Sequence, residues 1–363
     1  MITQITFLIT TAVSVGVCYL VLRLAQKYKL ALQTPRERDI HTKPISRLGG
    51  VAVVITFLLM VLIFKAVLPK IDSDFGFPFS FLGLSFDKRL LGIVISTLFL
   101  SIVMLKDDLK GLRAYTKLGS QIIAALILIA AGVGITYLNN PFGLTIRLDS
   151  LAWPITVGAD VYHIVFWADL LFIVWVLLLT NATNFIDGLD GLAGSLSFVA
   201  AVVLGVMSLQ MGQISTAILS SIFAGAILGF LFFNLPPAKI FLGDTGSMFL
   251  GLMLAVLSFI TGGKLATVFF VFALVIIDAI YVIVKRLVRR QNPFTTADQT
   301  HLHHRFLKAG FSNQGALSTI IAFSLAFGLS ALYLEPKTKL ITIAALTILT
   351  IAMFIVLDLR QKK

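Results

Sequence analysis

Long apolar segments separated by short polar ones repeat along almost the whole chain. Each apolar segment has about 17 to 25 residues, the length that a helix needs to cross a roughly 30 Å hydrocarbon core. The pattern predicts eleven membrane-spanning helices, at residues 3–25, 48–68, 89–105, 118–138, 164–181, 189–210, 213–233, 245–262, 264–285, 316–334 and 338–357. Between the fourth and fifth of them, Pro and Gly residues around the segment TIRLDS predict a short β-hairpin within residues 139–163.

The composition supports an all-α polytopic membrane protein. Hydrophobic residues make up 58% of the chain, charged residues only 13%, and the mean hydropathy of +0.99 lies far outside the range of soluble domains. Because there is a single cysteine, Cys18, no disulfide framework can form. The first apolar segment lacks a basic leader and is too long for a signal peptide, so we interpret it as a retained helix. No repeat or hydrophilic domain interrupts the helices, and residues 1–363 are therefore interpreted as one membrane domain.

The distribution of basic residues predicts the orientation. With the amino terminus outside and the carboxyl terminus in the cytoplasm, the inner loops hold 21 of the 29 Lys and Arg residues, as the positive-inside rule requires. The net charge of +12 then reflects topology and attraction to anionic phosphates at the inner face. No soluble face interleaves basic with aromatic residues, so a nucleic-acid partner is not expected.

Four polar motifs follow predicted helices 3, 5, 7 and 9: DDLK at residues 107–110, NATNFIDGLDG at 181–191, NLPPAKIFLGDTGS at 234–247 and HLHHRF at 301–306. In the predicted orientation all four face the cytoplasm. We therefore expect them to build one active site at the cytoplasmic face of the membrane.

The carboxylates of the first and third motifs are candidate metal ligands. Asp107 and Asp108 are adjacent, and Mg²⁺ in proteins usually takes one or two carboxylates together with water and substrate phosphate. Two solvated charges at a helix end are the alternative. Asp244 lies near the start of a helix, where an Asp is commonly only an N-cap. A metal role for Asp244 is favoured if the first pair lies nearby, because the helix amino terminus would also attract phosphate.

The second and fourth motifs combine amides, carboxylates and imidazoles. Asn181 and Asn184 are three residues apart, as are Asp187 and Asp190, so on a helical turn each pair would share a face. Amides offer donor and acceptor edges to a nucleobase or sugar, although Asn, Asp and Gly are also ordinary turn residues. The fourth motif holds an imidazole cluster beside an arginine. No cysteine lies near enough to favour zinc, and this residue set suits a diphosphate and sugar hydroxyls. These residues are His301, His303, His304 and Arg305. Asp278, an acid inside helix 9, is a further candidate.

Together and in this order, the motifs DDLKGL, NATNFIDGLDGLAG, NLPPAKIFLGDTGS and PFTTADQTHLHHRFLKAGFS resemble those of the polyprenyl-phosphate N-acetylhexosamine-1-phosphate transferases. The resemblance covers essentially the whole chain, and eleven helices fit it. HLHHRF followed by KAGFS looks like the branch that uses UDP-GlcNAc and undecaprenyl phosphate. The related phospho-MurNAc-pentapeptide transferases usually have three consecutive histidines, where this chain has Leu302 between His301 and His303.

The resemblance implies a role for each matching residue. Asp107 and Asp108 would form the catalytic and Mg²⁺-binding pair, and Asp244 would be a direct ligand of Mg²⁺, or of Mn²⁺ in its place. Asp187 and Asp190 would be catalytic. The nucleotide would contact Asn181, Asn184, Asp187, Phe241, which would stack on uracil, and Lys43. The sugar diphosphate would contact His301, His303, His304, Arg305 and Lys117.

The function implied is the transfer of GlcNAc-1-phosphate from UDP-GlcNAc to undecaprenyl phosphate with release of UMP. In the bacterial inner membrane this is the first membrane step of a cell-envelope polysaccharide such as O-antigen, enterobacterial common antigen or teichoic acid. A phospho-MurNAc-pentapeptide transferase is the nearest alternative, and an ion-coupled transporter is a more distant one. The acids gather at inner helix ends with little at the bilayer midplane, which argues against a transporter. The sequence leaves open whether the protein forms a homodimer.

Overall fold

The computed structural model describes residues 1–33, 44–68, 78–81, 84–138, 140, 143–157, 160–262, 264–288 and 302–360. Within these residues the chain is mostly helical, with α1 (Ile2–Tyr28), α2 (Gly49–Val67), α3 (Lys88–Lys110), α4 (Ala114–Ala130), α5 (Phe166–Ile186), α6 (Leu192–Gln210), α7 (Ile214–Asn234), α8 (Gly243–Ile260), α9 (Leu265–Val288), α10 (Leu302–Lys308), α11 (Asn313–Tyr333) and α12 (Pro336–Arg360). Ten of these helices are long and apolar enough to cross a membrane, and α4 is a shorter apolar helix. The eleven predicted apolar helices are therefore present.

Four antiparallel two-stranded hairpins connect the helices: β1 (Leu32–Gln33) with β2 (Ile45–Ser46), β3 (Pro78–Phe81) with β4 (Leu84–Asp87), β5 (Tyr137–Leu138) with β6 (Ile146–Arg147), and β7 (Ala152–Val157) with β8 (Asp160–Val165). In the longest of them Ala152 is opposite Val165 and Val157 is opposite Asp160. One hairpin was expected within residues 139–163, around TIRLDS. The structure has two over residues 137–165, in which β6 of TIRLDS pairs with β5, and β7 pairs with β8.

The helix ends differ from the sequence pattern in ways that affect the site. α3 continues to Lys110, so Asp107 and Asp108 lie in its last turn instead of beyond it. α5 continues to Ile186 and includes Asn181 and Asn184. Polar residues at a helix end extend the helix past its apolar segment because their side chains find partners on neighbouring helices. The HLHHRF motif forms most of a separate short helix, α10.

The opposite error occurs at α4, which ends at Ala130 instead of residue 138. Gly132 adopts φ +85°, a backbone conformation that residues with a side chain rarely adopt and that interrupts the helix. Leucine and alanine continue the apolar pattern up to this point, so hydropathy alone gives no sign of the helix end.

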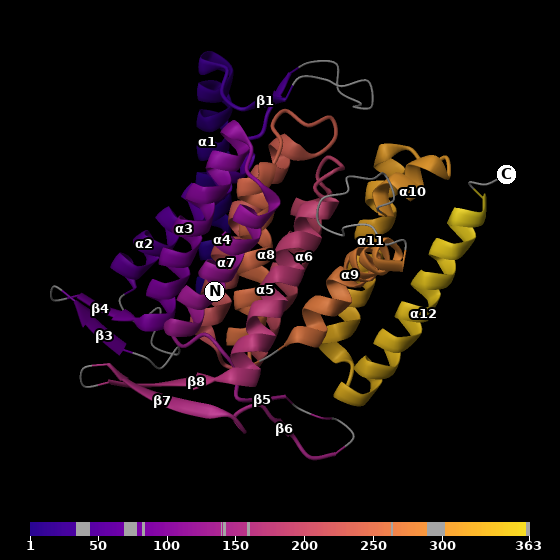
Figure 1. The fold of residues 1–363 in the computed structure, drawn as a ribbon. Helices are drawn as coiled ribbons and strands as arrows, with labels where there is room; N and C mark the ends of the chain where they lie inside the picture. The colour runs from indigo at the N-terminus through magenta and orange to yellow at the C-terminus, as the bar shows by residue number, and fades with distance from the viewer. Residues whose placement is uncertain are drawn as a thin grey trace.

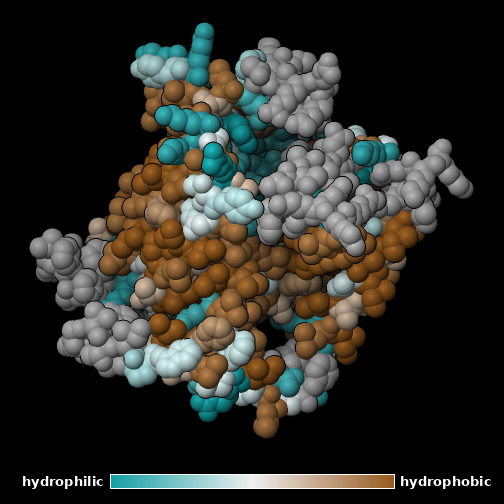
Figure 2. Space-filling model, in the orientation of Figure 1, coloured by the Kyte–Doolittle hydropathy of each residue, from teal (hydrophilic) through white to brown (hydrophobic). Residues whose placement is uncertain are grey.

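The bundle has two parts when viewed from the side (Figure 1). α1 to α8 form the larger part, and α9, α11 and α12 stand beside it. α11 packs on both α6 and α9, whereas α12 packs on α9. β1 and α10 lie at one end of the bundle, and the hairpins β3–β4, β5–β6 and β7–β8 lie at the other end. Between the two ends the surface in this view is a broad apolar belt (Figure 2). This arrangement is that of a multi-pass membrane protein.

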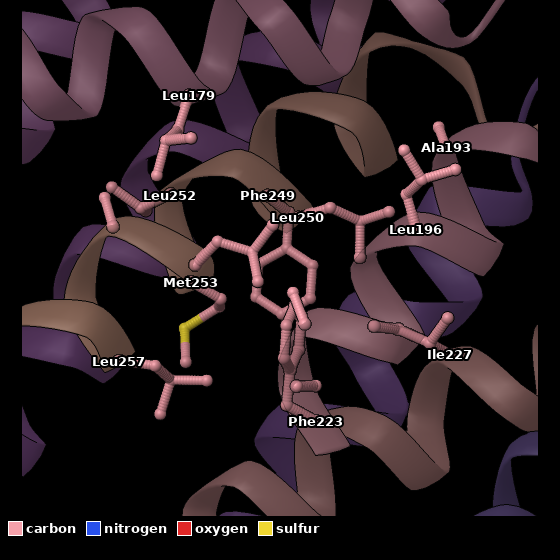
Figure 3. Packing of buried hydrophobic residues seen from close by; sticks show 14 of the residues in the cluster. Leu179, Ala193, Leu196, Phe223, Ile227, Phe249, Leu250, Leu252, Met253 and Leu257 are labelled. Carbon is pink, nitrogen blue, oxygen red and sulfur yellow. The ribbon is translucent and has the colours of Figure 1, made fainter. Parts of the chain in front are cut away.

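α8 is the central helix of the larger part. Almost all of its residues are buried, and it contacts α2, α3, α5, α6, α7 and α9. Phe249 of α8 packs on Phe57 of α2 and on Phe223 of α7, with ring centroids 5.3 and 5.7 Å apart (Figure 3). Such buried contacts hold helices together in lipid, where van der Waals packing replaces the hydrophobic effect. Because α8 is fixed from all sides, its amino terminus is a rigid platform for Asp244.

Glycines bring the start of α2 against the start of α8. The N–H groups of Gly49 and Gly50 donate to the carbonyls of Phe241 and Leu242, at 2.9 and 2.8 Å. A Cβ placed on Gly50 would lie 2.1 Å from the backbone nitrogen of Gly246, so no larger residue fits there. This crossing places Arg47, two residues before Gly49, beside Asp244.

Candidate functional site

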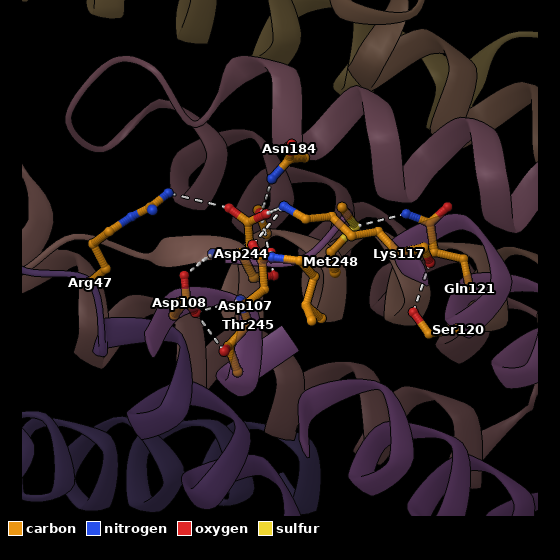
Figure 4. A network of polar contacts seen from close by, with 12 residues as sticks. Arg47, Asp107, Asp108, Lys117, Ser120, Gln121, Asn184, Asp244, Thr245 and Met248 are labelled. Atoms are coloured by element: carbon orange, nitrogen blue, oxygen red, sulfur yellow. Dashed lines mark hydrogen bonds and ion pairs between the residues drawn. The ribbon is translucent and has the colours of Figure 1, made fainter. Parts of the chain in front are cut away.

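Two carboxylates from different helices converge on one lysine. Lys117, in the first turn of α4, places its Nζ atom 2.6 Å from Asp107 Oδ2 of α3 and 2.5 Å from Asp244 Oδ2 of α8 (Figure 4). The other oxygen of Asp107 accepts a hydrogen bond from the N–H of Leu112 at 2.6 Å. Asp107 and Asp244 are both buried, at 7% exposure each. The structure therefore brings together three residues that the sequence predicted separately.

Asp108 has a different set of partners although it is the neighbour of Asp107. Its Oδ1 atom accepts from the N–H of Asp244 at 2.8 Å, and its Oδ2 atom accepts from the N–H and the hydroxyl of Thr245 at 2.9 and 2.6 Å. Asp108 thus caps the amino terminus of α8 from another helix and satisfies N–H groups that have no partner within α8. This geometry favours Asp107 and Asp244 over Asp108 as metal ligands.

Arg47 completes the cluster, and it was not among the site residues predicted from the sequence. Its guanidinium lies 3.3 Å from Asp244 Oδ1 and is partly exposed. Gly243, which precedes Asp244, has φ +71°, and a Cβ there would lie 2.2 Å from the carbonyl oxygen of Arg47. The sequence signal for Arg47 was its place in a basic segment two residues before the paired glycines of α2.

The two asparagines of the second motif face neighbouring helices. Asn184 donates to Ser247 Oγ of α8 at 2.9 Å, and Asn181 donates to Gln121 Oε1 of α4 at 3.0 Å. Gln121 in turn donates to the sulfur of Met248 at 3.1 Å. Asn181 and Asn184 therefore tie the end of α5 to α4 and α8 beside the carboxylates, and Gln121 is a second residue that sequence reasoning missed.

The three-residue spacing predicted that Asp187 and Asp190 share a helical face. The structure shows that they do not. Asp187 is the carboxyl-terminal cap of α5, and Asp190 lies in the turn before α6. Asp190 Oδ2 accepts from the N–H of Ala238 at 3.1 Å. Burial, followed by the negative charge of Asp244, raises the pKa of Asp187 well above its ordinary value, although the positive charge of Arg47 opposes this.

Phe241 lies in the segment between α7 and α8, two residues before the start of α8. Its N–H donates to the carbonyl of Ser46 at 2.8 Å and its carbonyl accepts from Gly49, so its backbone is fixed by β2 and α2. The residue as a whole is half-buried. Stacking on a base stays a prediction.

The remaining predicted residues divide into two groups. Lys43 and His301 lie outside the described residues, and of His303 and His304 only the backbone, within α10, is described. Arg305 is fully described, and its guanidinium packs over the rings of Tyr281 and Phe354, 4.7 and 4.5 Å from their centroids, with 1% of the residue exposed. Arg305 therefore packs between α9, α10 and α12 in this structure. Its contact with a sugar diphosphate stays a prediction.

The candidate ligands of a hard cation are the carboxylates of this cluster. Asp107 and Asp244 face the cationic groups of Lys117 and Arg47, whereas Asp108 faces the start of α8. Among the described residues no group of three or more His, Cys, Asp and Glu side chains is arranged to hold a metal ion. Asp107 and Asp244 supply two carboxylates, and Mg²⁺ usually takes one or two from a protein and fills its shell with water and phosphate. Binding of Mg²⁺ by this pair stays a prediction.

Comparison with known proteins agrees with this geometry. Residues 90–262 match glycosyl transferase family 4, a span that contains the first three polar motifs and Lys117. The chain is 30% identical to a "probable undecaprenyl-phosphate N-acetylglucosaminyl 1-phosphate transferase" of Bacillus subtilis, covering 90% of this chain and 84% of that protein. It is 31% identical to a decaprenyl-phosphate N-acetylglucosaminephosphotransferase of Mycolicibacterium smegmatis, covering 91% and 82%. It is 28% identical to a phospho-N-acetylmuramoyl-pentapeptide-transferase of Staphylococcus carnosus, covering 77% and 83%.

Proposed function

This chain belongs to glycosyl transferase family 4, and from that premise we propose that it transfers GlcNAc-1-phosphate from UDP-GlcNAc to undecaprenyl phosphate, releasing UMP. The relatives support the coarser statement that it is a multi-pass membrane enzyme that moves a sugar 1-phosphate to a polyprenyl phosphate. The observation that carries the proposal is the convergence of Asp107, Lys117 and Asp244 where α3, α4 and α8 meet.

GlcNAc is favoured over the muramoyl pentapeptide by two observations. The relatives named for N-acetylglucosamine align over about nine tenths of this chain, whereas the pentapeptide transferase of Staphylococcus carnosus aligns over 77%. Leu302, which stands within the histidine cluster, is fully buried, and its N–H donates to Asp278 Oδ2 at 3.0 Å. This position therefore belongs to the packing between α9 and α10, where an imidazole would be buried.

The residues of the cluster have separable tasks in this reaction. Lys117 and the partly exposed Arg47 attract the diphosphate of the donor and hold it beside the carboxylates. Asp107 and Asp244 would hold Mg²⁺, which when bound would neutralise charge on the diphosphate. Asn184 keeps the end of α5 against α8, and Phe241 would stack on the uracil ring.

We favour direct attack by the lipid phosphate. A phosphate oxygen of the lipid forms a bond to the phosphorus that carries the sugar, while the bond from that phosphorus to the UMP oxygen breaks. The lipid phosphate is already largely ionised near neutral pH, so no base is needed to activate it. Both oxygens of Asp107 have partners, Leu112 and Lys117, which makes Asp107 a poor nucleophile. Isolation of a phosphosugar bound to Asp107 when lipid is omitted would contradict direct attack.

The proposal includes a location and a pathway. The amino terminus lies outside and the carboxyl terminus in the cytoplasm of the bacterial inner membrane, so that the site meets UDP-GlcNAc. The product, undecaprenyl-diphospho-GlcNAc, would start a cell-envelope polysaccharide such as O-antigen or teichoic acid.

The test is UMP release by the detergent-purified protein with Mg²⁺ and undecaprenyl phosphate, offering UDP-GlcNAc and UDP-MurNAc-pentapeptide separately. Release from UDP-GlcNAc alone, dependent on lipid and metal, is the expected result. Release only from the pentapeptide donor would assign the protein to peptidoglycan synthesis, and no release from either would refute the proposal. Asp244→Asn should lose activity that high Mg²⁺ partly restores. Asp149→Asn is the matched control, because Asp149 pairs with exposed Arg147 in the hairpin region at the other end of the bundle.

A further inference from the structure

Asn234, the last residue of α7, joins the two polar loops that flank the site. Its side chain is buried, with 3% of the residue exposed. The Oδ1 atom accepts a hydrogen bond from the N–H of Gly191 at 3.0 Å, and the Nδ2 atom donates to the carbonyl of Ile240 at 2.9 Å. One amide group therefore holds the loop at residues 187–191 against the loop at residues 235–242.

Two further contacts show how closely these loops approach. Asp190 accepts from the N–H of Ala238. Gly191 has φ +77°, and a Cβ placed there would lie 2.8 Å from the side chain of Leu235. The loops are thus in van der Waals contact and are joined by hydrogen bonds at two points. One is made by Asp190 of the first loop, and the other by Asn234, which directly precedes the second loop. A change at Asn234 would be transmitted to both loops.

Each loop carries a residue assigned above to the donor nucleotide. Asp187 begins the first loop, and Phe241 directly follows Ile240 in the second. We propose that Asn234 is a positioning residue that fixes Asp187 relative to Phe241 and thereby sets the affinity for the UDP-sugar. This inference rests on the proposed function. It predicts that Asn234 acts on the nucleotide side of the reaction and leaves the lipid phosphate side unchanged.

Asparagine is the side chain that this position requires, because one partner donates and the other accepts. Leucine has a similar size but can make neither hydrogen bond, so it would leave a buried N–H and a buried carbonyl without their partner. An ionised aspartate keeps the acceptor for Gly191 but turns a second acceptor toward the carbonyl of Ile240. A protonated aspartate can donate to that carbonyl and restores both bonds.

The experiment compares wild type, Asn234→Leu and Asn234→Asp in the UMP-release assay. For Asn234→Leu we expect the KM for UDP-GlcNAc to rise about tenfold, as for the loss of one or two hydrogen bonds, with the KM for undecaprenyl phosphate unchanged. For Asn234→Asp, the KM for UDP-GlcNAc relative to wild type should fall as the pH is lowered. Ser14→Ala is the control. Ser14 of α1 donates to the carbonyl of Ala226 at 2.7 Å, in the same helix, α7, that ends at Asn234, and it lies in neither loop.

An equal rise in both KM values, or a change in kcat alone, would overturn the inference, as would an Asn234→Asp variant whose relative KM is independent of pH. Hydrogen exchange of peptides 187–191 and 235–242 supplies a readout without turnover. Faster exchange of both peptides in Asn234→Leu and not in Ser14→Ala is expected, and unchanged exchange would refute the link. If the proposed function fails, the wild type releases no UMP. Failure of this inference instead leaves wild-type release intact, while Asn234→Leu shows no selective rise in the KM for UDP-GlcNAc.

Discussion

Replacing Asp108 separates the cap of α8 from the carboxylates that face Lys117. Asp108 accepts three hydrogen bonds from the first turn of α8, two from backbone N–H groups and one from the hydroxyl of Thr245. In Asp108→Ala the two N–H groups lose their acceptor in a buried environment. The adjacent Asp107 offers a matched comparison, because it is equally buried but accepts only the N–H of Leu112 and pairs with Lys117.

The expected magnitudes follow from these contacts. A buried donor left without a partner costs about 1 to 3 kcal/mol, so Asp108→Ala should lower the free energy of unfolding by about 3 kcal/mol. Asp108→Asn keeps one acceptor oxygen and should lose about 1 to 2 kcal/mol. Asp107→Ala removes the hydrogen bond from Leu112 and the ion pair with Lys117, but Lys117 keeps its ion pair with Asp244, so a smaller loss of about 1 kcal/mol is expected.

The assay is unfolding of the purified protein in mixed micelles of mild detergent and SDS, with the free energy extrapolated to zero SDS. UMP release is measured in parallel under conditions where each variant is folded. Asp107→Ala should be folded and inactive, whereas Asp108→Ala should be markedly less stable. Equal destabilisation by the two alanine variants, or a larger loss for Asp107→Ala, would refute the assignment of Asp108 as the cap of α8.

Three further perturbations test other parts of the structure. Gly50→Ala would bring a Cβ to 2.1 Å from the backbone nitrogen of Gly246 and should destabilise the protein by about 3 kcal/mol in the SDS assay, whereas Gly16→Ala, with open space around it, should not. Because the pKa of Asp187 is raised in the folded protein, the folded protein keeps a proton that the unfolded chain releases above the ordinary pKa of 3.8. The free energy of unfolding should therefore fall as the pH rises from 3.8 through the raised pKa. Asp187→Asn should flatten that fall when unfolding is measured at a series of pH values with EDTA. Arg305→Ala should lower the unfolding free energy by about 2 kcal/mol or more, because it leaves a cavity between two aromatic rings; unchanged stability would contradict its packing role.

The sequence by itself determined the membrane fold and the identity of most site motifs. Helix number and approximate position follow from local properties, since a stretch of about 20 apolar residues is long enough to span the bilayer whatever its neighbours are. The polar motifs were recognisable for a related reason, because charges and amides near lipid are retained only where they have partners or a task. The helix ends were less certain, as the longer α3 and α5 and the shorter α4 show.

The division of labour within those motifs was decided by tertiary structure. Asp107 and Asp108 are neighbours in the chain, but successive residues of a helix point about 100° apart, so the first faces Lys117 and the second faces the start of α8. The partners of Arg47 and Asn234 were not predictable from the sequence, because Asp244 lies 197 residues from Arg47 and Gly191 lies 43 residues from Asn234. A side chain's role depends on which groups surround it. Those groups come from helices far apart in the chain, and a local sequence pattern does not predict how such helices pack together.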